Sequence, residues 1–349
     1  MPDTATFVLF VANPARIAKL PAMNQKIRWG VLGWARIARN EVIPATNRSR
    51  NGLVQAVASR SEAKLAECRA QLNPPTLHRR YEDLLADPAV DAVYNPLPNA
   101  LHKEWTIKAA EAGKHVLCEK PVALNAAETR EMIAACRANG VVFMEAFMYR
   151  YSARTAKVVE ILRSGVLGEI KFIHSQFRFL LNRPGDVRRE AGLGGGSLYD
   201  VGCYPLNFAG LVIDTVTNRA SGTGPRPESV QTQRVEVNGV DELFSAVLRY
   251  PGGLIASLHS GFNAHNRVLS EIIGTQGVLE IPATFFGMAG HLTLIRGEER
   301  TEIAVPESDR YRLQAEDFAH AILLQRPPLL TTDETLRNME LIDRLYAAK

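Results

Sequence analysis

A turn near the N-terminus has residues suited to holding the phosphates of a nucleotide. An apolar run over residues 27–32 ends at Gly33, and a helical pattern follows from Ala35. This is the dinucleotide-binding fingerprint with alanine in the second and third glycine positions; the first glycine permits the tight turn, and small residues let the backbone approach a pyrophosphate. N–H groups at the helix start would bind the phosphates, and an ordinary tight turn is the alternative. The residues predicted to hold the pyrophosphate are Gly33, Trp34, Ala35, Arg36 and Ile37.

A second segment, Ser59-Arg60-Ser61, follows the next predicted strand and bears on the type of cofactor. An acidic residue in this place would bind the ribose hydroxyls of NAD, whereas an arginine between two hydroxyls favours the 2′-phosphate of NADP. A solvated arginine at a helix start is the alternative, but positive charge opposes the helix dipole there. The segment therefore predicts NADP, with NAD less favoured. Lys64, in the helix that follows, is assigned to the same site.

Lys120 stands directly after a predicted strand over residues 114–118. Open α/β sheets bind ligands beyond the carboxyl ends of their strands. Oxidation of an alcohol needs a base for the hydroxyl proton and a positive group near the oxygen as the hydride leaves. Lysine can serve in both roles, since burial lowers its pKa, and Pro121 restricts the backbone beside it. The alternative is a surface lysine near a strand end.

The elements that position these residues alternate between strand and helix over residues 25–148. Such alternation predicts right-handed crossovers and a doubly wound parallel sheet of the Rossmann type with both faces covered. The predicted strands are 27–32, 53–58, 90–94, 114–118 and 141–144, and the predicted helices are 35–45, 61–72, 81–86, 100–112 and 125–138.

Residues 149–349 have a different pattern, which predicts a second α+β domain for substrate binding and oligomerisation. After a helix over 154–163, short alternating runs follow one another with no helices between them, which indicates a large open, mainly antiparallel sheet. Its apolar face must be covered by helices or by another subunit. The predicted strands are 170–179, 234–237, 243–250, 254–260, 267–273, 278–281 and 291–296, and helices 311–324 and 333–347 end the chain.

The composition of the 349-residue chain excludes several classes of protein. A net charge of +4, with both signs interleaved, gives no reason to expect nucleic-acid binding. No apolar run approaches the ~20 residues of a membrane helix, and no His/Cys/carboxylate set has metal-ligand spacing. The four cysteines form no C-x-x-C pair, so free thiols in the cytoplasm are expected.

Residues 1–24 are expected to be a loose extension, and Met23 is an alternative start.

Three further segments resemble one family. They are Glu119-Lys120-Pro121, residues 145–150 (Glu-Ala-Phe-Met-Tyr-Arg) and residues 194–204, which read Gly-Gly-Gly-Ser-Leu-Tyr-Asp-Val-Gly-Cys-Tyr. In this order they are similar to the glucose–fructose oxidoreductase, inositol dehydrogenase and rhizopine-catabolism (Gfo/Idh/MocA) family. The similarity extends from Ile27 to the C-terminus and is greatest to the branch with NADP-dependent D-xylose dehydrogenases and dimeric dihydrodiol dehydrogenases.

The resemblance implies roles for named residues. Lys120, Asp200 and Tyr204 would be catalytic, with Tyr204 as the proton donor or acceptor where inositol dehydrogenases place histidine. If Asp200 and Tyr204 share a helix, they face the same side; a helix cap is the other role open to Asp200. Further cofactor contacts are assigned to Pro96, Leu97, Asn99, His102, Glu119, Lys120, Pro121 and Arg150, and substrate contacts to Lys120, Tyr149, Arg178, Asp200 and Tyr204.

Some assignments stay open at this level. His102 fits the cofactor loop and, equally, the first turn of a helix with no ligand. Arg178, Arg183 and Arg188 all precede the glycine run, and the sequence does not choose among them.

The family's activity is hydride transfer between NADP and a CH–OH or C=O carbon of a sugar or sugar-like molecule, such as D-xylose or a trans-dihydrodiol. Alternatives are a ketosugar reductase, a glycosidase-like member that retains its NAD(P), and a non-catalytic NADP-binding regulator. A homodimer or higher oligomer through the C-terminal sheet is expected.

Overall fold

The computed structural model describes residues 25–183 and 185–348, so the predicted extension 1–24, including Met23, lies outside the described residues. The chain folds into two compact units. The first unit contains residues 25–148 and 309–332, and the second contains residues 149–308 and 333–348. Each unit is described on its own below.

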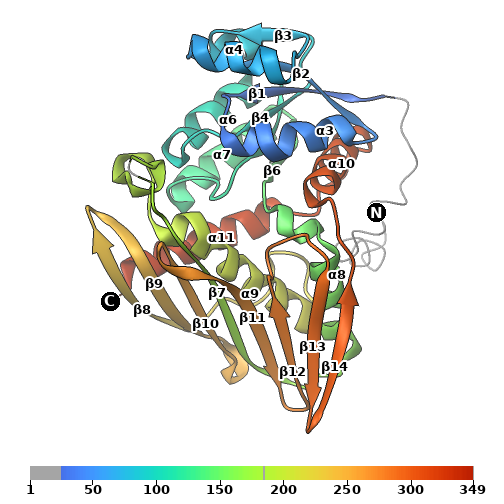
Figure 1. Cartoon of the computed structure of the whole chain (residues 1–349), viewed down its shortest axis with the longest axis vertical. Coiled ribbons are helices and arrows are strands. Elements are labelled where there is room, and N and C mark those ends of the chain that lie inside the picture. Colours follow the sequence, from blue (N-terminus) through green and yellow to red (C-terminus); the bar gives the residue numbers. More distant parts are fainter. Residues whose placement is uncertain (1–24, 184, 349) are drawn as a thin grey trace. The chain divides into compact units, whose positions relative to one another are not determined.

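The first unit is built on a six-stranded parallel sheet with the order β3-β2-β1-β4-β5-β6, in which the chain passes from one half of the sheet to the other between β3 and β4 (Figure 1). This is the predicted doubly wound Rossmann arrangement. Its strands are β1 (Ile27–Leu32), β2 (Gly52–Ala58), β3 (Thr76–His78), β4 (Ala92–Asn95), β5 (His115–Cys118) and β6 (Phe143–Glu145). Its helices are α3 (Ile43–Arg48), α4 (Glu62–Gln71), α5 (Tyr81–Ala86), α6 (His102–Glu111), α7 (Ala126–Ala138) and α10 (Arg310–Leu323), with short turns η1 (Ala38–Val42) and η2 (Asn99–Leu101).

Two details of the first unit differ from the sequence prediction. The helix after β1 was expected to end near Pro44, but it continues to Arg48 because a π-helical turn, η1, precedes Pro44 and leaves the proline in the first turn of α3. A missing N–H is tolerated there. The edge strand β3 was not predicted, because it has only three residues and all are half-buried.

Helix α10 packs with the first unit, although its place in the chain had assigned it to the second domain. The rings of Trp29 in β1 and Phe318 in α10 lie 5.2 Å apart. The side-chain amide of Asn51 donates to the carbonyl oxygen of Glu316 at 3.0 Å. Buried contacts of this kind depend on residues far apart in sequence, so local patterns do not reveal them.

The second unit contains an eight-stranded sheet with the order β14-β13-β12-β11-β7-β10-β9-β8. All neighbouring strands are antiparallel except β7 and β10, so the sheet is mainly antiparallel, as predicted. The strands are β7 (Ile170–Leu180), β8 (Ser229–Val237), β9 (Val240–Arg249), β10 (Ile255–Gly261), β11 (Asn263–Gly274), β12 (Val278–Pro282), β13 (Gly290–Arg296) and β14 (Glu299–Val305). The sequence did not predict β14, whose residues are mostly exposed and whose first four residues are all polar or charged.

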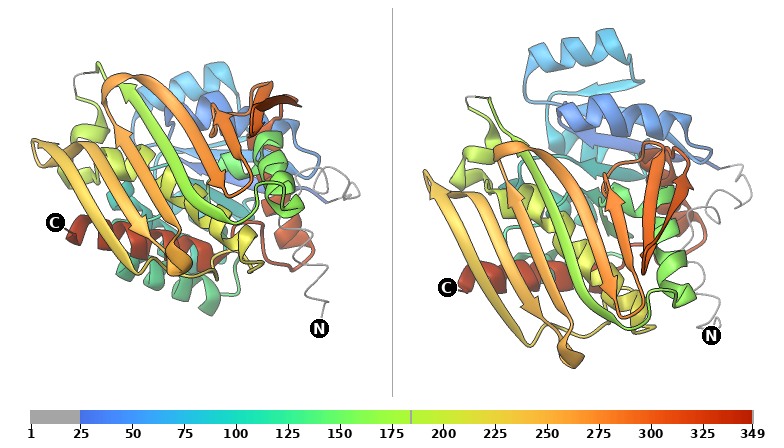
Figure 2. Two further views of the ribbon diagram at one scale, coloured as in Figure 1. Left: turned by 90° about the horizontal axis from the view of Figure 1, so that it is seen from below. Right: turned by 60° about the horizontal axis from the view of Figure 1, so that its bottom comes forward.

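Helices cover one face of this sheet (Figure 2). They are α9 (Cys203–Val216), the π-helical turn η6 (Leu198–Gly202) before it, and α11 (Thr332–Ala347), while α8 (Ala153–Ser164) packs against α9. Ala256, Leu258 and Ser260 of β10 are buried on this face. Ser257 and His259 alternate with them and point to the other face, which no described helix of this unit covers. The sheet therefore has one face buried within the unit and one face free of its helices.

All four cysteines are buried and free, as the sequence predicted. Among the described residues, no helix is long and apolar enough to span a bilayer. The same residues contain no group of three His, Cys, Asp or Glu side chains placed to hold a metal ion.

Candidate active site

The turn after β1 has the geometry that a dinucleotide phosphate requires. Gly33 has φ of +95°, which side-chain-bearing residues rarely adopt, and a Cβ there would meet the side chain of Leu97 at 3.5 Å. The first helical hydrogen bond runs from the N–H of Arg39 to the carbonyl of Ala35 at 3.0 Å. The preceding N–H groups, including that of Arg36, thus have no acceptor within the helix. These features fit a bound pyrophosphate.

Trp34 lies in the same turn and is buried. Its indole N–H has no hydrogen-bond partner among the described residues. An unsatisfied buried donor is uncommon in proteins, and an anionic group at this turn would supply the missing acceptor. The Trp34 N–H is thus a donor without a protein acceptor in the same turn.

Of the three residues Ser59, Arg60 and Ser61, only Arg60 presents its polar end to solvent. The hydroxyl of Ser59 accepts the N–H of Ser61 at 3.2 Å, and the hydroxyl of Ser61 caps α4 by accepting the N–H of Lys64. The guanidinium carbon of Arg60 lies 5.6 Å from the centre of the Tyr81 ring, a cation–π contact. Tyr81, which the sequence did not single out, also has its hydroxyl 3.7 Å from a Cβ position on Gly33. It therefore holds Arg60 near the phosphate turn.

The loop after β4 contains the predicted residues Pro96, Leu97, Asn99 and His102. Pro96 and Leu97 are buried, and Asn99 is half-buried in η2. His102 is fully buried at the start of α6, so its ring is enclosed by protein. Its Nδ1 lies 2.9 Å from the Pro121 carbonyl oxygen and its Nε2 lies 2.7 Å from that of Leu97. The ring thus contacts the backbone of two loops.

Residues Glu119 to Pro121 follow β5 and are held in place by hydrogen bonds with buried neighbours. The hydroxyl of Tyr94 donates to Glu119 at 2.6 Å, and the N–H of Val122 donates to the buried carboxylate of Glu145 at 3.0 Å. Burial and the Glu119 charge raise the pKa of Tyr94 well above its usual value. The Lys120–Pro121 peptide bond is cis. Lys120 is half-buried at the carboxyl edge of the parallel sheet, on a backbone fixed on both sides.

In the second unit, the glycine run precedes the helix that carries the other candidate residues. Gly196 has φ of +118°, and a Cβ there would lie 2.4 Å from the Asp241 carboxylate. That carboxylate accepts the hydroxyl of Ser197 at 2.8 Å and the N–H of Leu198 at 2.7 Å. The hydroxyl of Tyr346 donates to it at 2.7 Å. Asp241, which the sequence analysis did not identify, thus fixes the start of η6.

Asp200 lies in η6 and is paired with an arginine. The Nε of Arg188 donates to the Asp200 carboxylate at 2.6 Å, and the same guanidinium contacts Asp186 at 3.2 Å. The charge of Asp200 is the main cause of a raised pKa for Arg188. Asp200 does not act as the helix cap, since Ser197 occupies that position. Of the three arginines left open by the sequence, Arg188 is the one that contacts a candidate catalytic residue.

Tyr204 follows Asp200 by four residues in a continuous helical run, η6 into α9, so both project to one side. Its side chain is only 4% exposed. Its ring centre lies 5.4 Å from that of Phe285, 5.5 Å from Phe177 and 5.9 Å from Tyr149. An aromatic, apolar wall therefore surrounds this phenol.

Tyr149 and Arg150, predicted to contact substrate and cofactor, belong to a buried network in the second unit. The Tyr149 hydroxyl donates to Asn207 at 2.6 Å. Arg150 forms an ion pair with Glu334, both with side chains at most 2% exposed, and Glu334 also accepts the amide of Asn207 at 2.7 Å. Burial raises the pKa of Tyr149. The polar groups of both residues are thus engaged within their own unit.

Arg178, the third predicted substrate residue in this unit, points away from Tyr204. Phe177 pairs in register with Ser260 on the helix-covered face and contacts Tyr204. Arg178 is the next residue of β7 and pairs with Gly261 and Arg267, so its side chain lies on the uncovered face. Within the unit, the sheet separates Arg178 from the phenol of Tyr204.

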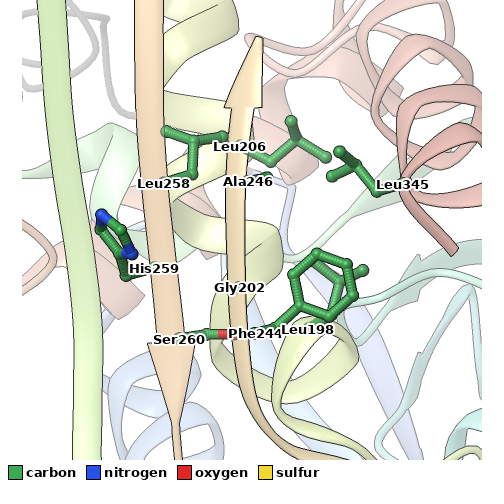
Figure 3. Close-up of a pocket in the computed structure, with 9 residues that line it drawn as sticks. All are labelled: Leu198, Gly202, Leu206, Phe244, Ala246, Leu258, His259, Ser260 and Leu345. Carbon is green, nitrogen blue, oxygen red and sulfur yellow. The ribbon is translucent and has the colours of Figure 1, made fainter. Parts of the chain in front are cut away.

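A small cavity of about 10 Å³ lies between η6, α9 and the sheet in the second unit (Figure 3). That volume holds about one water molecule, so the cavity is too small for a substrate. It is lined by Leu198, Gly202, Leu206, Phe244, Ala246, Leu258, His259, Ser260 and Leu345.

The chain belongs to the Gfo/Idh/MocA family. Residues 27–147 match the oxidoreductase family with an NAD-binding Rossmann fold, and residues 155–280 match the GFO/IDH/MocA C-terminal domain. The family and fold predicted from the sequence are confirmed.

Relatives with assigned names match most of the chain. D-xylose 1-dehydrogenase (NADP(+)) 2 of Haloferax volcanii is 38% identical over 323 residues, which are 91% of this chain and 96% of that protein. A trans-1,2-dihydrobenzene-1,2-diol dehydrogenase of Xenopus laevis is 33% identical over 284 residues, 80% of this chain and 82% of that protein. A solved 3-ketoreductase from Actinomadura kijaniata, in complex with NADP and TDP-benzene, has a TM-score of 0.85 at 29% identity and covers 93% of this chain and 98% of that one. The predicted oxidoreductase class and the predicted cofactor agree with these relatives.

Proposed function

We propose that this protein is an NADP(H)-dependent dehydrogenase or reductase that moves a hydride between nicotinamide and a CH–OH or C=O carbon of a sugar or sugar-like molecule. The observation that carries the proposal is the backbone around Lys120, fixed through Glu119 and Val122 at the carboxyl edge of a Rossmann sheet. A lysine on a rigid loop at this edge has the position and charge that alcohol oxidation needs. The relatives that act on D-xylose and on a dihydrodiol support the substrate class.

The proposed cofactor is inferred from residues of the first unit. The Gly33 turn and the helix start after it fit a pyrophosphate. The exposed Arg60, whose guanidinium packs against the Tyr81 ring, fits a 2′-phosphate. Two of the three relatives described above are an NADP(+)-dependent dehydrogenase and a 3-ketoreductase in complex with NADP. Bound NADP⁺ supplies the hydride acceptor, and the residues of the chain orient the substrate and move its proton.

Lys120 and Tyr204 have complementary chemical roles in this proposal. As the hydride leaves the carbon, negative charge grows on the substrate oxygen, and the ammonium group of Lys120 stabilises it. The phenol of Tyr204 passes on the hydroxyl proton; its reference pKa near ~10 requires a cation to make the phenolate accessible. The hydrogen bond from Arg188 holds the Asp200 carboxylate in place for orienting the substrate.

The test is reduction of NADP⁺, followed by NADPH absorbance, across aldoses, inositols, trans-dihydrodiols and TDP-ketosugars, the last in the reverse direction. Lys120→Met should lower kcat on the order of a hundredfold to ten-thousandfold, the usual range for acid–base groups. Tyr204→Phe should lower kcat as well, and the double variant should lose less than the product of the two losses, since both disable one step. Lys108→Met, an exposed lysine of α6, is the matched control. Unaltered kcat in Lys120→Met would refute the assignment of that lysine.

A glycosidase-like member would turn over substrate without releasing NADPH, and a regulator would bind NADP with no turnover. Appearance of free NADPH in proportion to oxidised substrate excludes both. Cofactor binding with no turnover on the whole panel would favour the regulator.

We also propose that a second copy of the chain covers the free face of the eight-stranded sheet, giving a dimer or higher oligomer. Val235 and Val247 lie on that face and are 49% and 40% exposed, a degree of apolar exposure that marks interaction surfaces when it is contiguous. Val247→Glu should shift the sedimentation coefficient towards a monomer at micromolar concentration, whereas Leu324→Glu, exposed in the first unit, should not. A monomer in the unaltered protein would contradict this proposal.

Four buried free thiols support a reducing compartment such as the cytoplasm. Thiol labelling of the denatured protein taken directly from cells should modify all four.

A further inference from the structure

Asp241, the second residue of β9, contacts the start of the helical run that carries Asp200 and Tyr204. Its side chain is buried, with 2% of the residue exposed. One carboxylate oxygen, Oδ2, accepts the N–H of Leu198 at 2.7 Å and the hydroxyl of Ser197 at 2.8 Å. Ser197 is the N-cap residue of η6 and Leu198 its first residue. A carboxylate of the sheet therefore holds the first turn of this helix.

The other oxygen of Asp241 binds a residue of the C-terminal helix. Oδ1 accepts the hydroxyl of Tyr346, in the last turn of α11, at 2.7 Å. The Tyr346 ring is itself fixed, since its centre lies 5.1 Å from that of Tyr199 and 5.7 Å from that of Phe244. Burial raises the pKa of Asp241, and its hydrogen bonds act in the opposite direction. The carboxylate is thus held in place by donors from both η6 and α11.

A displacement of this first turn would reach both candidate catalytic residues. From Leu198 the helical run continues through η6 into α9 without a break. Asp200 follows Leu198 in the same turn, and Tyr204 is the second residue of α9. A shift at Leu198 would therefore move the Asp200 carboxylate and the Tyr204 phenol together.

We propose that Asp241 is a positioning residue for the catalytic step: by holding the first turn of η6, it sets where the Asp200 carboxylate and the Tyr204 phenol lie in the site. This inference rests on the roles proposed for Asp200 and Tyr204. Asp241 acts through the helix, because it is buried and both of its oxygens are engaged within the second unit.

Two replacements of similar size test whether the hydrogen bonds of Asp241 are what matters. In Asp241→Asn, the amide oxygen can still accept from Leu198 and Ser197, and the amide nitrogen can donate to the hydroxyl oxygen of Tyr346. In Asp241→Leu, the side chain fills a similar space but accepts no hydrogen bond, so the buried N–H of Leu198 loses its partner. A purely structural role predicts lower stability for Asp241→Leu but an unchanged kcat wherever the protein is folded.

The expected result is a difference in kcat between these two variants. The assay is NADP⁺ reduction with the best substrate of the panel above, at a temperature at which calorimetry shows every variant to be folded. Asp241→Asn should leave kcat almost unchanged, whereas Asp241→Leu should lower it about ten- to a hundredfold, the size of effect expected when catalytic groups are displaced by about 1 Å. The Kd for NADP⁺ should change in neither, because the turn after β1 and Arg60 belong to the first unit.

Asp214→Asn is the matched control, at the other end of α9. This buried carboxylate also accepts two backbone N–H groups, from Gly222 and Gly224, and it pairs with Arg337. Its replacement should lower Tm but not kcat. Tyr346→Phe is a milder version of the test, for use where Asp241→Leu does not fold: it keeps the ring, removes one donor to the carboxylate and should lower kcat about two- to fivefold.

The Tyr204 ring gives a readout that does not depend on turnover. In NMR spectra of protein with ¹³C-labelled tyrosine, the Tyr204 resonance is identified by its absence in Tyr204→Phe. Its chemical shift is sensitive to displacement, because the rings of Phe177 and Phe285 lie 5.5 and 5.4 Å away, centre to centre. The resonance should move in Asp241→Leu and stay in place in Asp241→Asn.

The outcomes separate this inference from the proposed function. Where Tyr204→Phe is impaired, an unaltered kcat in Asp241→Leu, or a Tyr204 resonance that moves equally in Asp241→Asn and Asp241→Leu, overturns the positioning role. If Tyr204→Phe retains full kcat, the proposed role of Tyr204 fails. A resonance that moves only in Asp241→Leu then still supports the placement of the helix by Asp241.

Discussion

Replacement of Arg60 by glutamine should raise the Kd for NADP⁺ about 30- to 150-fold and leave that for NAD⁺ almost unchanged. The guanidinium is exposed and held over Tyr81, so its pairing with a 2′-phosphate would occur in a high effective dielectric. A charge-assisted hydrogen bond there contributes ~2–3 kcal/mol, and each 1.4 kcal/mol corresponds to about a factor of ten in Kd. NAD⁺ lacks the phosphate, so it does not use this interaction.

The assay is calorimetric or fluorescence titration of both cofactors at constant ionic strength, repeated at higher salt. Screening should weaken the NADP⁺ preference of the unaltered protein, while Arg60→Gln should show little salt dependence. Arg79→Gln removes the same charge from an arginine of the first unit that is 78% exposed, and it should not change the ratio. Arg60→Asp should reverse the preference, because a carboxylate repels the phosphate and can accept the ribose hydroxyls.

The reasoning is wrong if Arg60→Gln keeps its NADP⁺ to NAD⁺ ratio within threefold of the unaltered protein. The selectivity would then have to come from other groups, such as Lys64 or the hydroxyls beside Arg60. Tyr81→Leu tests the contribution of the aromatic ring separately from that of the Arg60 charge. It removes the cation–π contact of about 0.5–1 kcal/mol and should raise the Kd for NADP⁺ by only two- to fivefold.

Two further predictions concern stability. Glu334→Gln breaks the buried ion pair with Arg150, which should cost about 3–5 kcal/mol of folding free energy and lower Tm by roughly 10 °C at ~2–4 °C per kcal/mol. Glu340→Gln, in the same helix but in a partly exposed ion pair, should change Tm little. Equal shifts of Tm for the two variants in calorimetry would contradict this prediction. Between pH 6.5 and about 4 the unfolded chain protonates His102 while the folded chain does not, so stability should fall by up to ~3 kcal/mol as pH falls through that window. His102→Gln should flatten this dependence in denaturant titrations, and an unchanged slope would contradict it.

Short-range signals predicted most of the first unit. The sequence Asn125-x-x-Glu128 was interpreted as a helix start, and Asn125 does accept the N–H of Glu128 at 2.9 Å while Glu128 accepts that of Leu124 at 3.1 Å. Gly140 was predicted to end that helix, and it has φ of +65°. These features depend on neighbouring residues only, so a sequence pattern is sufficient to find them.

The strands that the sequence analysis did not predict lack such patterns. Strand β3 is three residues long with no buried face, and β14 is exposed along most of its length. Both are edge strands held by pairing with a single neighbour, so apolar alternation is not required of them. The face to which Arg178 points could have been inferred, because its neighbour Phe177 is apolar and successive strand residues alternate.

Site residues differ from fold elements because their chemical type does not determine their partners. Arg150 and Arg60 are both arginines beside sequence motifs, but Arg150 is buried against Glu334, 184 residues away, whereas Arg60 is exposed on an aromatic ring. Only the long-range contact separates a structural cation from one that can bind a ligand. The same holds for His102, for which the sequence left a cofactor contact and an unliganded helix start equally open, and whose ring nitrogens the structure places 2.9 Å from the carbonyl oxygen of Pro121 and 2.7 Å from that of Leu97.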